Sequence, residues 1–187
     1  MEDHQIIDLY WQRDPDAIKE TAGKYGAYCF AIAENILCSP EDSEECVNDT
    51  WLNAWNAIPP QKPLHLRMFL AKITRNLSLN RFRSRSAEKR GGGQMALVLD
   101  ELSECLPGKA DVQSEYEAKE LGQCIRLFVR SLPERDGNVF LRRYFFTEDI
   151  SEIAKRYRLT GNNVMVILSR VRKKLKTHLI EEGFFSE

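Results

Sequence analysis

Basic side chains gather near the C-terminus of the chain, where they could bind a polyanion. The run from Lys155 to Lys176 holds eight lysines and arginines and no acidic residue. Duplex DNA is a dense line of phosphates, and cations held on one face of a protein bind it by releasing its counterions. Two helical patterns joined by a short turn span Asp149–Lys176, and the second is the basic one, as in a helix-turn-helix. The alternative is a solvated, charged helix near the end of the chain.

A second group of cations lies in the middle of the chain, on and just after another predicted helix. Arg75, Asn76 and Asn80 recur at helical spacing, opposite a stripe of leucine and isoleucine. Arginines contact phosphates, whereas asparagines contact bases or sugars, so this face also suits a nucleic acid. A solvated face is again the alternative. The candidate residues are Lys72, Arg75, Asn76, Asn80, Arg81 and Arg83.

The charge is strongly polarised along the chain, although the net charge is only −1. Residues 1–64 hold 4 basic and 12 acidic residues, and residues 65–90 hold 8 basic and 1 acidic. This pattern favours localised contacts with a polyanion over a uniformly basic coat. The acidic helix predicted after Pro40 presents an outward face that suits protein docking, with an aromatic rim. Core packing is expected for at least one of its two tryptophans. The candidates for docking are Asp42, Glu45, Asn48, Asp49, Trp51 and Asn53.

Helical periodicity dominates the chain, so the sequence predicts an all-α fold with two small helical domains. Three amphipathic helices, over 16–37, 40–58 and 66–82, form a bundle within residues 1–90. A flexible linker is expected over 91–112, where Gly91–Gly93 and Pro107–Gly108 interrupt the pattern. Its apolar cluster Leu97, Val98, Leu99 and Leu102 is expected to dock against something. Residues 113–187 resume the helical pattern and contain the helix-turn-helix.

Signs of catalysis are weak, and we expect no catalytic residue, no cofactor, no metal site and no small-molecule substrate. His4, His65 and His178 lie far apart, and no zinc-protease, phosphate-loop or nucleophile-elbow motif occurs. The carboxylates around Glu41–Asp49 suit the start of a helix without any metal. Five cysteines without a C-x-x-C pair indicate free thiols in a reducing cytoplasm, the alternative being a redox or metal role. No apolar run is long enough to span a membrane, so a cytoplasmic, non-membrane protein is expected.

Two segments in the first half of the chain are distinctive: 40–55 reads PEDSEECVNDTWLNAW, and 69–80 reads FLAKITRNLSLN. They resemble two consecutive helices of region 2 of the extracytoplasmic-function (ECF) sigma factors, the small sigma-70 relatives of bacterial RNA polymerase. LPER at 132–135, ISEIA at 150–154 and the stripe Val164–Leu175 resemble sigma region 4. The segments lie at both ends of the chain, in the order of the family.

The resemblance implies a transcription initiation factor with two domains. The region 2 domain, residues 1–90, would bind core RNA polymerase through the acidic face. It would also capture the opened −10 promoter strand through the middle basic helix and the Pro59–His65 loop. The linker would thread into the polymerase, and the region 4 domain, residues 113–187, would read the −35 element. An anti-sigma factor is an expected further partner. The alternative is a helix-turn-helix regulator that acts without a sigma role.

The last helix would enter the major groove at the −35 element. It departs from the family at Met165 and Val166, where a basic residue is common; these side chains suit either thymine methyls or a partner protein. Arg158 stands where glycine is common, so either a left-handed backbone or a shifted turn is expected there. The candidates for −35 contact are Asn162, Asn163, Met165, Val166, Ser169, Arg170, Arg172 and Lys173.

Overall fold

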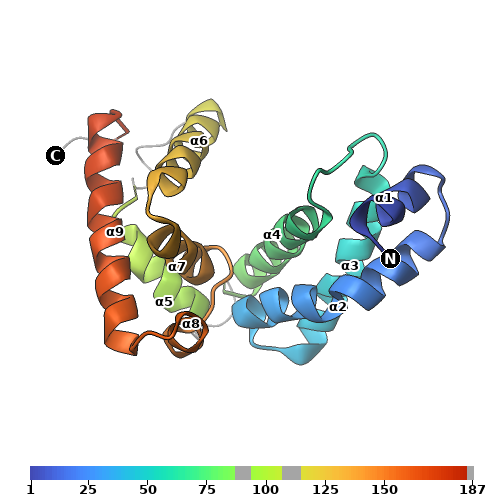
Figure 1. Ribbon diagram of the computed structural model, residues 1–187, viewed down its shortest axis with the longest axis horizontal. Helices are drawn as coiled ribbons and strands as arrows, with labels where there is room; N and C mark the ends of the chain where they lie inside the picture. The colour runs from blue at the N-terminus through green and yellow to red at the C-terminus, as the bar shows by residue number, and fades with distance from the viewer. Residues whose placement is uncertain (87–93, 107–114, 185–187) are drawn as a thin grey trace. The chain divides into compact units, whose positions relative to one another are not determined.

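The computed structural model describes residues 1–86, 94–106 and 115–184, and all regular structure within them is α-helical. The chain divides into two compact units, Met1–Gly93 and Gln94–Glu187, and each has its own hydrophobic core. The predicted all-α fold is therefore confirmed for the described residues. Figure 1 shows the helices of each unit.

Within residues 1–86, the N-terminal unit has four helices, one more than the sequence predicts. They are α1 (Asp3–Trp11), α2 (Asp16–Leu37), α3 (Pro40–Ala57) and α4 (Leu66–Ser86). The additional helix, α1, buries Ile6, Ile7 and Tyr10 in the same core as α2 to α4. The observed bounds of α2 coincide with those predicted, because its apolar stripe runs without interruption for its whole length.

Small hydroxyl residues bring α3 and α4 together and so fix the faces that the two helices present to solvent. The hydroxyl groups of Thr50 and Thr74 lie 3.0 Å apart, and both residues are fully buried. The carbonyl one turn earlier in each helix also lies within hydrogen-bond distance, so the single proton of each hydroxyl has an acceptor whichever of the two donates across the pair. The opposite sides of α3 and α4 consequently stay exposed.

The described residues of the C-terminal unit form five helices. They are α5 (Gln94–Ser103), α6 (Glu115–Ser131), α7 (Glu134–Tyr144), α8 (Ile150–Tyr157) and α9 (Gly161–Glu181). The last helix, α9, contributes a stripe of apolar side chains at helical spacing to the core, as predicted. The buried residues of α9 are Val164, Ile167, Leu168, Val171, Leu175 and Leu179.

Helix α5 corrects the prediction of a flexible linker over 91–112, at least for residues 94–106. Met95 and Val98 are buried, and Leu102 packs on the core of the C-terminal unit. The predicted docking of the apolar cluster is thus confirmed for Val98 and Leu102, whereas Leu97 and Leu99 are exposed. Residues 91–93 and 107–112 of the predicted linker lie outside the described residues.

Glu101 on α5 is the centre of a polar network that sequence reasoning missed. Its carboxylate accepts from Arg143 Nη2 at 2.6 Å and from the Tyr144 hydroxyl at 2.7 Å. The Arg143 side chain is only 2% exposed, so Glu101 neutralises a buried cation. Gln94 adds a second tie, because its Oε1 accepts from Arg143 at 2.8 Å and its Nε2 donates to Asp149 at 2.6 Å. Helix α5 is therefore held to the C-terminal unit by apolar and ionic contacts together.

This network makes the C-terminal unit sensitive to acid. Burial alone would raise the pKa of Glu101, but hydrogen bonds from Arg143 and Tyr144 outweigh it and hold the pKa below its usual value. A carboxyl whose pKa is lower in the folded state stabilises that state above its unfolded pKa of about 4.5, and this stabilisation is lost as the pH falls through the folded value. We expect the free energy of unfolding of this unit to fall as the pH drops below about 4.5 and through the lowered pKa of Glu101. Residue-resolved hydrogen exchange measures this, and a Glu101→Gln variant should show a shallower pH dependence.

Candidate nucleic-acid interface

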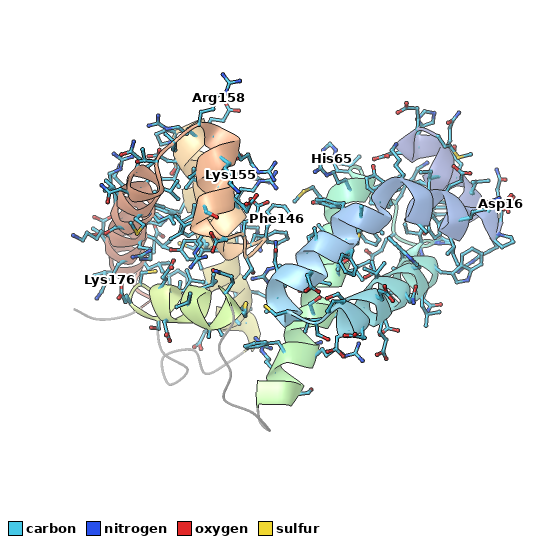
Figure 2. The ribbon with its side chains drawn as sticks, turned by 90° about the horizontal axis from the view of Figure 1, so that it is seen from below. Asp16, His65, Phe146, Lys155, Arg158 and Lys176 are labelled. Atoms are coloured by element: carbon cyan, nitrogen blue, oxygen red, sulfur yellow. The ribbon has the colours of Figure 1, made fainter. Side chains whose placement is uncertain are left out.

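Helices α8 and α9 form a helix-turn-helix whose turn is fixed by local hydrogen bonds. Asp149 caps α8, accepting from the backbone N–H of Ser151 at 2.6 Å, and Thr160 caps α9, accepting from that of Asn163 at 3.1 Å. Arg158 ends α8 with φ of 53°, a left-handed backbone, which is one of the two outcomes that the sequence predicts. Its side chain is exposed and points outward (Figure 2), so a residue other than glycine is accommodated there.

The exposed face of α9 carries most of the residues predicted to contact the −35 element. Met165 is 49% and Val166 56% exposed, while Asn162 and Asn163 in the first turn are also exposed. A shallow groove runs along this face. It is lined by Asn162, Met165, Val166, Ser169, Arg170, Lys173 and Lys174. Lys174, absent from the predicted set, belongs to this surface; its place one turn after Arg170 was the available signal.

Arg172 lies apart from the predicted set. Its Nη1 donates to the Tyr144 hydroxyl at 2.7 Å, and its guanidinium pairs with Glu101 at 3.5 Å and Glu104 at 3.8 Å. Burial opposes the charge, but the hydrogen bond to Tyr144 and the two carboxylates outweigh it and raise the pKa of Arg172. Its assignment to the DNA-contacting set is therefore corrected: Arg172 holds α5 against α9.

Substitutions at the neighbouring residues Arg172 and Lys173 are expected to have different effects, the first on stability and the second on DNA affinity. Arg172→Gln should lower the free energy of unfolding of the C-terminal unit by about 1.5 kcal/mol, because it removes charge-assisted hydrogen bonds. Lys173→Gln should leave stability unchanged and weaken binding to duplex DNA about threefold, with a smaller salt dependence. Thermal melting and fluorescence anisotropy on the two variants measure both effects. Equal losses of DNA affinity without loss of stability would contradict this division.

Helix α4 presents a basic and amide face in the N-terminal unit. Lys72, Asn76, Asn80 and Arg83 are exposed, as predicted, and Arg75 is half-buried on the same helix. Burial lowers the pKa of Arg75, and the nearby charge of Arg83 lowers it further. Cations in such surroundings favour an anionic ligand, which supports a phosphate contact at this face. Lys89 and Arg90, which extend the basic stretch in the sequence, lie outside the described residues.

Arg81 is the exception on α4 and points to the opposite side. It lies nine residues after Lys72, a rotation of about 180° around an α-helix, so it faces α3 instead of the basic face. Its guanidinium pairs with Glu45, and with Asp42 at 3.5 Å. Arg81 is therefore corrected from a DNA-contacting residue to a link between α3 and α4.

The acidic face of α3 is exposed, except at one predicted position. Glu45, Asn48, Asp49 and Asn53 all face solvent, and Asp42 is partly covered by its ion pair with Arg81. Trp51 is only 7% exposed and packs in the core of the N-terminal unit, because it lies on the inner side of the helix. The prediction that Trp51 belongs to the docking face is therefore wrong.

Sequence reasoning also missed an apolar residue in the acidic face. Leu52 is 58% exposed and lies one residue from Asn53, between acidic and amide side chains. Leu52 adds apolar area to a face that is otherwise charged and polar. Its position, off the inner stripe of α3, was the signal in the sequence.

Each of the two units matches a known protein-family model. Residues 23–88 match the model for sigma-70 region 2, and residues 122–175 match a model for sigma-70 region 4. The chain belongs to the sigma-70 family. It is a sigma factor of the ECF type, which directs RNA polymerase to promoters, and core polymerase and promoter DNA are its partners. No curated protein matches the chain significantly.

The two matches together decide between a sigma factor and an ordinary helix-turn-helix regulator. Region 4 alone would leave the question open, but the region 2 match covers α3, α4 and most of α2. An ordinary regulator has no reason to carry region 2, so that alternative is not favoured. Sigma-70 factors are initiation factors and not enzymes. Helices α1 and α5 lie outside both matched ranges.

Two further observations concern only the part of the chain that the structure describes. No helix there is both long and apolar enough to cross a membrane. No three side chains of histidine, cysteine, aspartate or glutamate come together there in a way that would hold a metal ion. All five cysteines are free thiols.

Proposed function

We propose that the two units of this sigma factor divide promoter recognition between them. The C-terminal unit reads the −35 element as duplex DNA, and the N-terminal unit binds core polymerase and the −10 element. The observation that carries this proposal is the groove along α9, whose apolar and amide floor is bordered by Arg170, Lys173 and Lys174. This factor acts in the cytoplasm, where polymerase and promoters meet.

The groove along α9 suits direct reading of bases with a grip on the adjoining phosphates. Asn162 and Asn163 can each hydrogen-bond adenine, while Met165 and Val166 suit the methyl group of thymine. Asn162 lies in the first turn of α9, which is the end that enters the major groove in this type of motif. The cations lie farther along the helix and provide the phosphate contacts. An A/T-rich −35 element is the expected target.

The exposed face of α4 suits single-stranded DNA. Arg75 and Arg83 provide positive charge for the backbone, and Asn76 and Asn80 provide hydrogen bonds to bases. The loop before α4 includes His65, which is exposed (Figure 2). We infer that this loop and α4 together hold the opened −10 strand, since an unpaired base needs both stacking and hydrogen-bond partners.

The acidic face of α3 is the proposed surface for core polymerase. Glu45 and Asp49 supply charge that steers association, and Leu52 supplies an apolar anchor that is desolvated on binding. An anti-sigma factor is the further proposed partner. It would cover exposed apolar residues of this sigma factor, such as Leu52 or Val166.

Reconstituted transcription tests the proposal. The chain is added to core polymerase with a library of promoter fragments, and run-off products are sequenced to find the selected −10 and −35 elements. Substitution of both Met165 and Val166 with serine should change the selected −35 sequence and leave the −10 preference intact. Asn76→Ala with Asn80→Ala should slow strand opening and leave duplex binding unchanged. Loss of selectivity at the other element in either variant would contradict the division of labour.

A further inference from the structure

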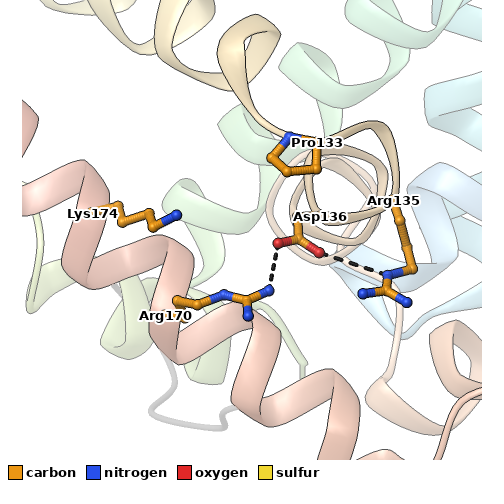
Figure 3. A pocket seen from close by; sticks show the side chains of 5 residues that line it. All are labelled: Pro133, Arg135, Asp136, Arg170 and Lys174. Carbon is orange, nitrogen blue, oxygen red and sulfur yellow. Dashed lines mark hydrogen bonds and ion pairs between the residues drawn. The ribbon is translucent and has the colours of Figure 1, made fainter.

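A second hollow lies beside the groove of α9, on the side of α7. It is open, has a volume of about 450 Å³, and is lined by Pro133, Arg135, Asp136, Arg170 and Lys174. Figure 3 shows Arg170 and Lys174 reaching into it from α9, and Arg135 and Asp136 from the first turn of α7. Arg170 and Lys174 also line the groove proposed to read bases, so the two hollows share a wall.

Asp136 is an unusual acid for a surface that binds DNA. Its side chain is only 8% exposed, yet it lies among three cations at the edge of the proposed DNA surface. Its Oδ2 accepts from Arg170 Nη2 at 2.5 Å, and its Oδ1 lies 3.7 Å from Arg135 Nε. Each oxygen of the carboxylate therefore faces a different arginine.

Asp136 is buried and Arg170 is half exposed, which suits a carboxylate that orients a phosphate-binding guanidinium. The Arg170 side chain is 50% exposed, so one edge of its guanidinium is held by the buried carboxylate while the other stays open to solvent. An arginine has five N–H donors in a rigid, planar fork, and a single bond to Asp136 leaves most of them available. A long side chain fixed in this way loses less conformational freedom when it binds a phosphate.

We propose that Asp136 is a positioning residue: it orients Arg170 so that Arg170 and Lys174 together hold one backbone phosphate of the promoter duplex in this hollow. The proposal rests on the assignment of α9 to −35 binding and adds a site beside the base-reading groove. Arg135 completes the rim, and the three cations outnumber the single carboxylate beneath them. The amino end of α7 opens at the same place, where its dipole favours an anion.

The direction in which Asp136→Asn changes the affinity for DNA distinguishes a positioning role from a simple effect of charge. If Asp136 acted only as a negative charge near DNA, Asp136→Asn would remove a repulsion and tighten binding. If Asp136 positions Arg170, the same substitution weakens binding although the protein becomes more positive. Glu134→Gln is the matched control, because Glu134 is an exposed acid in the same helical turn and lies outside the hollow.

The experiment measures anisotropy of a labelled, mixed-sequence duplex with the full chain at several salt concentrations, since phosphate contacts do not depend on sequence. Arg170→Gln is expected to weaken binding about fivefold and reduce the salt slope by about one. Asp136→Asn should weaken it about threefold, and should have no such effect when Arg170 is already glutamine, as a double-mutant cycle requires for residues that act together. Glu134→Gln should leave affinity unchanged or raise it. Tighter binding by Asp136→Asn, or equal effects with and without Arg170, would overturn the proposal.

A second variant keeps the test decisive if Asp136→Asn unfolds the C-terminal unit. Arg170→Lys keeps the charge at an exposed position, but its single ammonium cannot hold Asp136 and a phosphate with a planar fork. The proposal predicts an affinity close to that of Arg170→Gln, and wild-type affinity for Arg170→Lys would overturn it. Failure of the underlying −35 assignment looks different: the wild-type chain itself would show no salt-dependent binding to the duplex, and Lys173→Gln would have no effect.

Discussion

Replacing Glu101 with alanine is expected to lower the free energy of unfolding of the C-terminal unit by about 3 kcal/mol, since removal of one member of a buried ion pair leaves the other charge uncompensated. The Arg143 guanidinium would remain 2% exposed with its principal partner gone. The Tyr144 hydroxyl and Arg172 would lose the same acceptor. Because three side chains share Glu101, the effect should exceed that of a typical surface ion pair.

Hydrogen exchange resolved by residue measures this effect, with the N-terminal unit as an internal reference. Protection of α7 and α9 should fall in Glu101→Ala, and protection of α2 to α4 should not change. Asp100→Ala is the matched control, because Asp100 is an exposed acid on the same helix. Unchanged protection of α7 in Glu101→Ala would show that α5 does not stabilise this unit.

Reversing the charge of Asp49 is expected to reduce affinity for core polymerase at least about tenfold, because a like charge placed against a basic partner surface costs more than the ~1.4 kcal/mol that a factor of ten represents. Asp49 lies at the middle of the acidic face of α3, with Glu45 one turn before it and Asn53 one turn after. Asp49→Lys should leave folding intact, since the Asp49 side chain is exposed and its backbone carbonyl still accepts from Asn53.

Titration of labelled sigma factor with core polymerase measures this affinity, and run-off transcription measures its consequence. Glu44→Lys is the control with the same change in charge, on a side of α3 that lies about 140° from Asp49 around the helix. Its affinity should stay within about twofold of wild type. Similar losses in both variants would mean that overall charge, and not this face, governs docking.

The sequence was most informative where structure depends on neighbouring residues. Helix α2 was predicted with its observed bounds because its apolar stripe is long and Pro40 stops the pattern beyond it. The left-handed backbone at Arg158 was among the predicted outcomes, and it depends on neighbouring residues alone, as do the caps of α8 and α9. These features require no knowledge of which distant segments meet.

The errors concern residues whose partners lie far along the chain. Helix α5 is short, lies between glycine-rich and proline-containing segments, and exposes Leu97 and Leu99, so its periodicity is weak. What holds it is Arg143, 42 residues after Glu101. Arg172 was predicted to contact DNA because of its charge alone. Its partner Glu101 lies far away in the sequence, and such a pairing leaves no local sequence pattern.

The same limit applies to the N-terminal unit. Arg81 belongs to a basic stretch in the sequence, but its pairing with Asp42 spans 39 residues and depends on how α3 packs against α4. Trp51 was included among the docking residues because it lies beside acidic residues in the sequence, although the helical period places it on the inner side. Helix α1 was missed because three apolar residues, Ile6, Ile7 and Tyr10, give too short a stripe to recognise.

The attachment of α5 also changes the allowed geometry of a promoter. A fully extended segment of 22 residues, 91–112, would span at most roughly 75 Å, whereas the seven residues that separate α4 from α5 in the sequence could span at most roughly 25 Å. Each added base pair between the two promoter elements lengthens the duplex by about 3.4 Å and turns it by about a tenth of a revolution. Because so few residues connect α4 and α5, we expect few such steps to be tolerated. The spacer length of a promoter would then be selected by the length of the connecting chain, without any side-chain contact to the DNA.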